Sequence, residues 1–171
     1  ADGGEGTTEA LVAGMNGELK NVEVCGPLHE KVCAQIGMIG ETAVIEMAQA
    51  AGLPLVAVEN RNPLVTTTYG VGEMIKNCIE AGCKKFIVGI GGSSTNDAGL
   101  GMLMALGFKF LDANGQEVMQ GGQGLSQVVS IDETNVLPEL ASCDFKIACD
   151  VNNPLYGTLG AAYIYAPQKG A

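Results

Sequence analysis

A glycine- and hydroxyl-rich stretch, residues 89–99 (GIGGSSTNDAG), restricts the possible folds of this chain more than any other segment. The apolar, β-branched run 86–90 leads into it and is typical of a buried strand. The dense apolar run 100–106 follows and predicts a helix that ends near Gly107. A strand, a glycine-rich turn and a helix in this order indicate an α/β protein, and such a turn can hold an anion on its free N–H groups.

The candidate ligand-binding residues of this turn supply backbone N–H groups, hydroxyls and one amide. Asp97 stands at the start of the predicted helix, where its carboxylate can cap the helix, hold a metal ion or accept a proton. On composition alone, a tight turn capped by Asp97 is the simpler interpretation, because glycine-rich loops are common. The substrate-binding candidates are Gly91, Gly92, Ser93, Ser94, Thr95 and Asn96.

The rest of the chain alternates predicted strands and helices. Gly40 and Glu41 suit a hairpin turn between two strands, while Thr7 or Thr8 can cap the first helix and Gly82 can stop the second. Because hairpins and strand–helix units are combined, we expect an α/β fold with a mixed β-sheet and flanking helices. The predicted strands are 19–24, 32–39, 42–47, 86–90 and 145–149, and the predicted helices are 9–13, 69–81 and 98–106.

Two acidic residues follow strand ends. Asp97 comes after strand 86–90, and Asp150 comes directly after strand 145–149 with Asn152 two residues on. Ligands collect at the carboxyl ends of strands in open α/β sheets. Asp150 and Asn152 therefore suit the binding of hydroxyls or of hydrated Mg²⁺, although an Asx turn closed by proline has the same composition.

Four further polar residues are candidates with simpler alternatives. Thr67 can offer a hydroxyl to a ligand or cap the helix that follows it. Lys169 can meet a phosphate as a point charge or lie in solvent. Asp2 and Glu5 lie among glycines ahead of a helix, where they suit a metal or phosphate environment or simply the helix N-terminus.

Composition and charge exclude several classes of partner. The formal net charge is −10 and no basic patch is present, which argues against nucleic acid and anionic membranes. No apolar run approaches the roughly 20 residues of a transmembrane helix. A single histidine and the lack of a Cys-x-x-Cys pair disfavour a zinc site. With no signal peptide evident, we expect reduced thiols and a cytoplasmic protein, with Cys33, Cys143 and Cys149 in the core.

Five motifs together identify a family more strongly than any one of them. The motifs are residues 1–7 (ADGGEGT), 63–67 (PLVTT), 89–97 (GIGGSSTND), 148–155 (ACDVNNPL) and 167–171 (PQKGA). With these motifs in this order and spacing, the chain resembles the glycerate kinase family from end to end. The resemblance implies ATP-dependent phosphorylation of D-glycerate, with 2-phosphoglycerate as the expected product.

The resemblance also implies a place within a longer protein. Full-length members have two α/β domains with the active site between them, and this chain resembles the second domain. We therefore expect residues 1–171 to be a single domain-like fragment, truncated at both ends, whose partners are D-glycerate and the missing N- and C-terminal segments of the same enzyme. The alternative is a non-catalytic isolated domain that at most binds small organic acids or phosphate.

Phosphoryl transfer depends on positioning and charge neutralisation, and this assigns expected roles to the candidates. Residues 91–96 are expected to hold the glycerate carboxylate or a phosphate group. Either Asp97 or Asp150 is expected to orient the glycerate hydroxyl or act as general base. The other acid is expected to hold Mg²⁺ with Asp2 or Glu5. Lys169 is expected to face the transferring phosphate of ATP.

Overall fold

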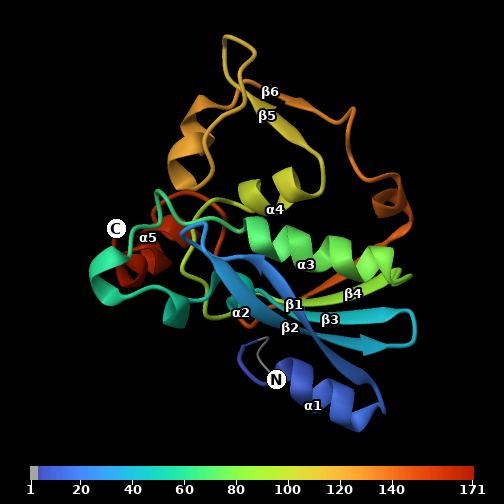
Figure 1. Cartoon of the computed structure of the whole chain (residues 1–171). Helices are drawn as coiled ribbons and strands as arrows, with labels where there is room; N and C mark the ends of the chain where they lie inside the picture. Colours follow the sequence, from blue (N-terminus) through green and yellow to red (C-terminus); the bar gives the residue numbers. More distant parts are fainter. Residues whose placement is uncertain (1–3) are drawn as a thin grey trace.

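The computed structural model describes residues 4–171, and its centre is a mixed five-stranded sheet of order β1-β2-β3-β4-β7 (Figure 1). The first three strands pair antiparallel, and β3, β4 and β7 pair parallel. Glu46 at the end of β3 lies opposite Gly89 of β4, which lies opposite Ala148 of β7. The carboxyl ends of three parallel strands therefore share one edge of the sheet. The strands are β1 (Glu18–Cys25), β2 (Lys31–Ile39), β3 (Thr42–Glu46), β4 (Lys85–Gly89) and β7 (Asp144–Ala148).

Helices cover both faces of the sheet (Figure 1). Helix α1 (Thr7–Gly14) contacts β2 and β3 on one face, and α3 (Tyr69–Glu80) contacts β1, β2 and β3 on the other. Helix α4 (Leu100–Ala105) packs on α3. Gly72 makes this packing close, because a Cβ there would lie 2.2 Å from the backbone oxygen of Met102.

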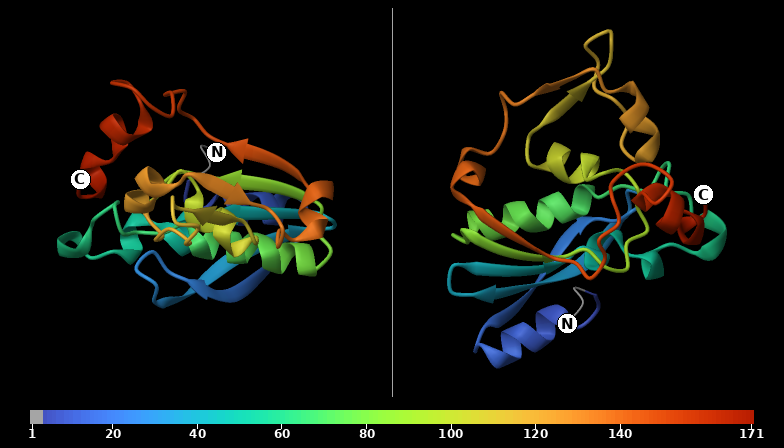
Figure 2. Two further views of the ribbon diagram at one scale, coloured as in Figure 1. Left: turned by 90° about the horizontal axis from the view of Figure 1, so that it is seen from above. Right: turned by 180° about the vertical axis from the view of Figure 1, so that it is seen from behind.

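Shorter elements extend the two ends of this arrangement. Strands β5 and β6 form a separate two-stranded sheet beyond α4. After β7 the chain turns back, and Figure 2 shows α5 beside the segment that carries the first two 3-10 helices. These elements are α2 (Ala48–Ala51), η1 (Leu53–Leu55), η2 (Val58–Asn60), β5 (Lys109–Leu111), η3 (Gly122–Gln127), β6 (Ser130–Asp132), η4 (Pro138–Ser142), α5 (Ala161–Tyr165) and η5 (Pro167–Lys169).

The main core lies between α3 and the sheet. The apolar face of α3 includes Met74 and Ile75, and it packs against Ile36, Ile45 and Phe86 of three neighbouring strands, all at most 2% exposed. Burial of side chains of this size contributes about 1.5–3 kcal/mol each. This core fixes the sheet edge at which β3, β4 and β7 end.

The expected mixed sheet with flanking helices is confirmed, including the Gly40 hairpin turn. The structure adds that β4 and β7 are parallel neighbours. The predicted capping of α1 is wrong, because Thr7 and Thr8 lie within the helix and the N-cap is the left-handed Gly6.

The expected core position is wrong for two of three cysteines. Cys33, on the solvent-facing side of β2, and Cys149, directly after β7, are exposed, whereas Cys143 is half-buried and packs against the main core. The buried thiols are those of Cys78 and Cys83, on and directly after α3.

Candidate functional site

A cavity of about 1370 Å³ opens at the carboxyl edge of the parallel strands. The loop after β4 forms one wall of it, and the segment after β7 forms another. Figure 2 shows both segments leaving the same edge of the sheet. Of the predicted ligand-binding residues, the cavity is lined by Gly91, Gly92, Ser93, Thr95 and Asn96, together with Asp97, Asp150 and Lys169.

The loop after β4 is anchored from behind and leaves donors unused. The N–H and the hydroxyl of Ser94 both donate to the Ala51 oxygen, at 2.8 and 3.0 Å. Within the described chain, the N–H groups of Gly91, Gly92 and Ser93 have no hydrogen-bond partner. A row of unpaired N–H groups on a cavity wall suits an anionic oxygen, because such groups cost free energy when left unsatisfied.

Lys169 reaches this loop from η5, near the other end of the chain. Its Nζ donates to Ser93 Oγ at 2.7 Å and to the Thr95 backbone oxygen at 2.6 Å. The side chain is 8% exposed, and burial lowers the pKa of Lys169 while the negative charge of Asp97 raises it. In the described residues no carboxylate lies within 4.0 Å of this ammonium, so its charge remains available to an anion in the cavity.

Asp97 is only 1% exposed, and its carboxylate accepts four hydrogen bonds. Oδ2 accepts from the N–H and hydroxyl of Thr68, at 3.0 and 2.8 Å, and from the N–H of Gly101 at 3.2 Å. Oδ1 accepts from the N–H of Gly99 at 3.2 Å. Asp97 thus ties the start of α3 to the start of α4, although the N-cap of α4 is Gly99 itself. Each carboxylate oxygen has two lone-pair sites, so three donors fill Oδ2 and one acceptor site is left on Oδ1.

Asp150 also lines the cavity, but it differs from Asp97 in exposure and in hydrogen bonding. It is exposed, and its carboxylate accepts no hydrogen bond from any described residue. Asn152 is exposed and does not line the cavity, whereas its neighbour Asn153 does. The Asn153 side chain donates to the Leu159 oxygen at 3.0 Å and accepts from the Tyr165 hydroxyl at 2.6 Å, which shapes the segment after β7.

Besides Asn152, four predicted site residues lie away from the cavity wall or cannot be placed. Ser94 is 1% exposed and supports the loop from behind, as described above. Thr67 is fully buried, donates to Gln120 Oε1 at 2.8 Å and accepts from the N–H of Tyr69 at 3.1 Å, although the N-cap of α3 is Thr68. Glu5 is exposed and not part of the lining. Asp2 lies outside the described residues.

One buried acid at the carboxyl edge of the parallel strands is absent from the residues predicted from the sequence. Glu46 is 2% exposed at the end of β3, and its Oε1 accepts from the N–H of Thr8 at 2.6 Å. It therefore holds the start of α1 beside the strand ends, close to the Gly4 that lines the cavity. The sequence signal for this burial was a glutamate at the end of the otherwise apolar run 43–46. A charged side chain in such a position is buried only when it is paired.

The segment after β7 carries many exposed apolar side chains. Most of them are more than half exposed, which is unusual for a stretch this short. They are Val151, Leu155, Tyr156, Leu159, Tyr163 and Ile164.

Known proteins share this fold. The model of the Glycerate kinase family matches residues 1–171. The chain is 52% identical to the glycerate kinase of Bacillus subtilis strain 168 and 52% identical to the glycerate 2-kinase of Escherichia coli K12, in each case over all of this chain and 45% of the relative. A crystal structure of a candidate glycerate kinase 2 from Salmonella typhimurium LT2 superposes with a TM-score of 0.96 at 48% identity, over 100% of this chain and 46% of that one.

The mixed sheet, its flanking helices and the cavity at the carboxyl edge of the parallel strands define an α/β protein with a candidate ligand site at its strand ends. The chain belongs to the glycerate kinase family. It spans a little under half the length of the curated relatives it matches.

Proposed function

We propose that this chain carries a substrate-binding part of a glycerate kinase, which transfers a phosphate group from ATP to D-glycerate and yields 2-phosphoglycerate. Membership of the family and about half identity to named glycerate kinases support the reaction. The observation that carries the site is the loop 91–96, whose free N–H groups and Lys169 face one cavity. An anionic substrate fits this wall, because Lys169 and the free N–H groups place positive potential there within an otherwise strongly acidic protein.

Within this proposal the two acids have different roles. Asp150 is the general base or orienting group for the glycerate hydroxyl, because its exposed carboxylate lines the cavity and is free of hydrogen bonds in the described part of the chain. Asp97 is a positioning residue, because it is buried and its four hydrogen bonds hold the starts of α3 and α4 together. Lys169 steadies Ser93 and Thr95 and places a positive charge beside the phosphate being transferred.

ATP and Mg²⁺ are the proposed cofactors. The described residues contain no group of three carboxylate, histidine or cysteine side chains that could hold a metal ion by themselves. Magnesium in kinases is held largely by phosphates, with one or two carboxylates, and Asp150 is the described carboxylate that fits this demand. Bound Mg²⁺ supplies neutralisation of phosphate charge. The predicted contributions of Asp2 and Glu5 stay predictions.

The exposed apolar segment 151–164 favours a second candidate function, which applies to residues 1–171 in isolation. Surfaces of this kind are normally covered by another part of a protein. We propose that residues 1–171 form one domain-like unit that, alone, binds small organic acids or phosphate without turning them over. No described helix is long and apolar enough to cross a membrane. The cytoplasmic location stays a prediction from the sequence.

A coupled assay tests both candidates. The full-length protein is given D-glycerate, ATP and Mg²⁺, ADP release is followed, and the product is distinguished by an enzyme that accepts 2-phosphoglycerate only. We expect turnover by the full-length protein and none by residues 1–171. Folded full-length protein that releases no ADP with D-glycerate would contradict the proposed reaction, and turnover by residues 1–171 would contradict the second candidate.

A further inference from the structure

Arg61 is the only arginine of this acidic chain, and it is half-buried beside a second cavity. It follows η2, and its Nε donates to the Val56 oxygen at 3.4 Å. Across residues 4–171 no carboxylate lies within 4.0 Å of its guanidinium. Because a guanidinium carries five N–H donors in a planar fork, most of its hydrogen-bonding capacity is left unused.

The second cavity, of about 820 Å³, presents further donors on the same wall. Asn60, Arg61 and Asn62 all line it. The Oδ1 of Asn62 is already engaged, because it accepts from the N–H of Leu64 at 3.0 Å, so the NH₂ of that amide is the part left for a ligand. Glu59 also lines the cavity, but its carboxylate forms no ion pair with the guanidinium within 4.0 Å.

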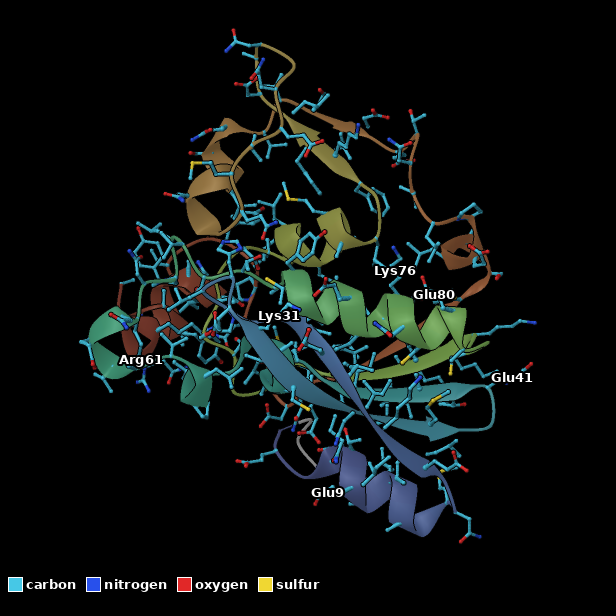
Figure 3. All side chains as sticks on the ribbon, in the orientation of Figure 1. Glu9, Lys31, Glu41, Arg61, Lys76 and Glu80 are labelled. Carbon is cyan, nitrogen blue, oxygen red and sulfur yellow. The ribbon has the colours of Figure 1, made fainter. Side chains whose placement is uncertain are left out.

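This wall is in contact with the segment that carries Lys169. Gly170 has φ +96°, and a Cβ on it would lie 2.1 Å from the backbone oxygen of Arg61. The residue after Lys169 is thus seated directly on Arg61. Figure 3 shows Arg61 on the turn beside the C-terminal helices, away from the other labelled charged residues.

We propose that Arg61 and Asn62 form a second anion subsite, which binds a phosphate or carboxylate group next to the segment that carries Lys169. Two oxygens of one carboxylate or phosphate group match two parallel N–H groups of the guanidinium, and the Asn62 amide adds a donor to the same group. The subsite stands independently of the proposed kinase reaction. Its assignment to the polyphosphate of ATP or to the carboxylate of D-glycerate rests on that reaction.

Phosphate binding by the full-length protein tests the subsite without any turnover. Inorganic phosphate is titrated calorimetrically into the wild type, Arg61→Gln and Lys76→Gln. The control removes the same charge from the exposed outer face of α3, far from this turn (Figure 3). We expect Arg61→Gln to weaken phosphate binding about 10- to 100-fold and Lys76→Gln to leave it unchanged. Equal affinities for wild type and Arg61→Gln overturn the proposal.

A second variant and a kinetic comparison complete the test. Arg61→Lys keeps the charge and loses the fork, so we expect it to bind phosphate at least threefold more weakly than wild type, and it decides the question if Arg61→Gln does not fold. A higher KM for ATP in Arg61→Gln assigns the subsite to nucleotide phosphate, and a higher KM for D-glycerate assigns it to the substrate carboxylate. Weaker phosphate binding in a protein without glycerate kinase activity supports the subsite and rejects the proposed reaction.

Discussion

Replacing Asp97 with asparagine separates its structural role from a chemical one. The change keeps the shape and removes the charge. If the amide oxygen takes the place of Oδ2, three donors keep an acceptor but lose the charge assistance, at roughly 1 kcal/mol each. The N–H of Gly99 then faces the amide NH₂ and is left unsatisfied in a half-buried position, which costs about 1–3 kcal/mol more.

The total loss for Asp97→Asn is therefore about 4–6 kcal/mol, a large share of the 5–15 kcal/mol by which proteins are usually stable. With a urea dependence of about 2 kcal/mol per molar, the unfolding midpoint should fall by about 2 M or more. Circular dichroism during urea titration measures this shift, and hydrogen exchange at the Thr68 and Gly101 amides should speed up in parallel.

Asp150→Asn is the matched control, because Asp150 is exposed and accepts no hydrogen bond from the described residues. We expect its free energy of unfolding to stay within about 0.5 kcal/mol of the wild-type value, while kcat falls about 10²- to 10⁴-fold. The reasoning is refuted if Asp97→Asn unfolds at the wild-type urea concentration and has lost its turnover, because Asp97 would then act on the substrate.

Three further predictions concern packing, charge and thiol chemistry. Gly72→Ala places a methyl against α4 and should lower the free energy of unfolding by about 1–3 kcal/mol, whereas Gly14→Ala, with nothing within 4 Å, should be neutral or raise it by up to about 1 kcal/mol in a thermal melt. Because burial lowers the pKa of Lys169, kcat/KM should begin to fall at a lower pH than it would with a solvated lysine. Lys169→Arg should move this decline to a higher pH. The free energy of unfolding should rise with pH between the folded and unfolded pKa values of Lys169, since the unfolded state binds more protons in that range. Burial raises the pKa of Cys78 to about 12, so a thiol reagent at pH 8 should modify exposed Cys149 in the native protein and Cys78 only after unfolding.

Local sequence patterns predicted the elements that depend on neighbouring residues. The alternation in β1, the Gly40 turn and the apolar face of α3 each arise within one turn or one strand, so they could be recognised before any tertiary contact was known. The shared edge of β4 and β7 was also foreseeable, because polar residues follow both strands.

Contacts between distant residues were beyond such patterns. Ser94 and Thr67 carry the same hydroxyls that a ligand site would use, and only the packing of Ala51 and Gln120 against them turns those hydroxyls inward. The burial of Glu46 depends on α1 returning to the sheet, 38 residues away in sequence. The exposure of Cys149 depends on β7 being an edge strand, which is a property of strand order and not of local sequence.

The bond between Lys169 and Ser93 has a consequence for how the protein is made. The two residues are separated by 76 positions, so the loop after β4 leaves the ribosome well before its ammonium partner. During that interval the sheet, α3 and α4 can assemble, but the anion-binding wall lacks its positive charge. A nascent or prematurely terminated polypeptide would therefore be folded in its core and yet unable to sequester acidic metabolites.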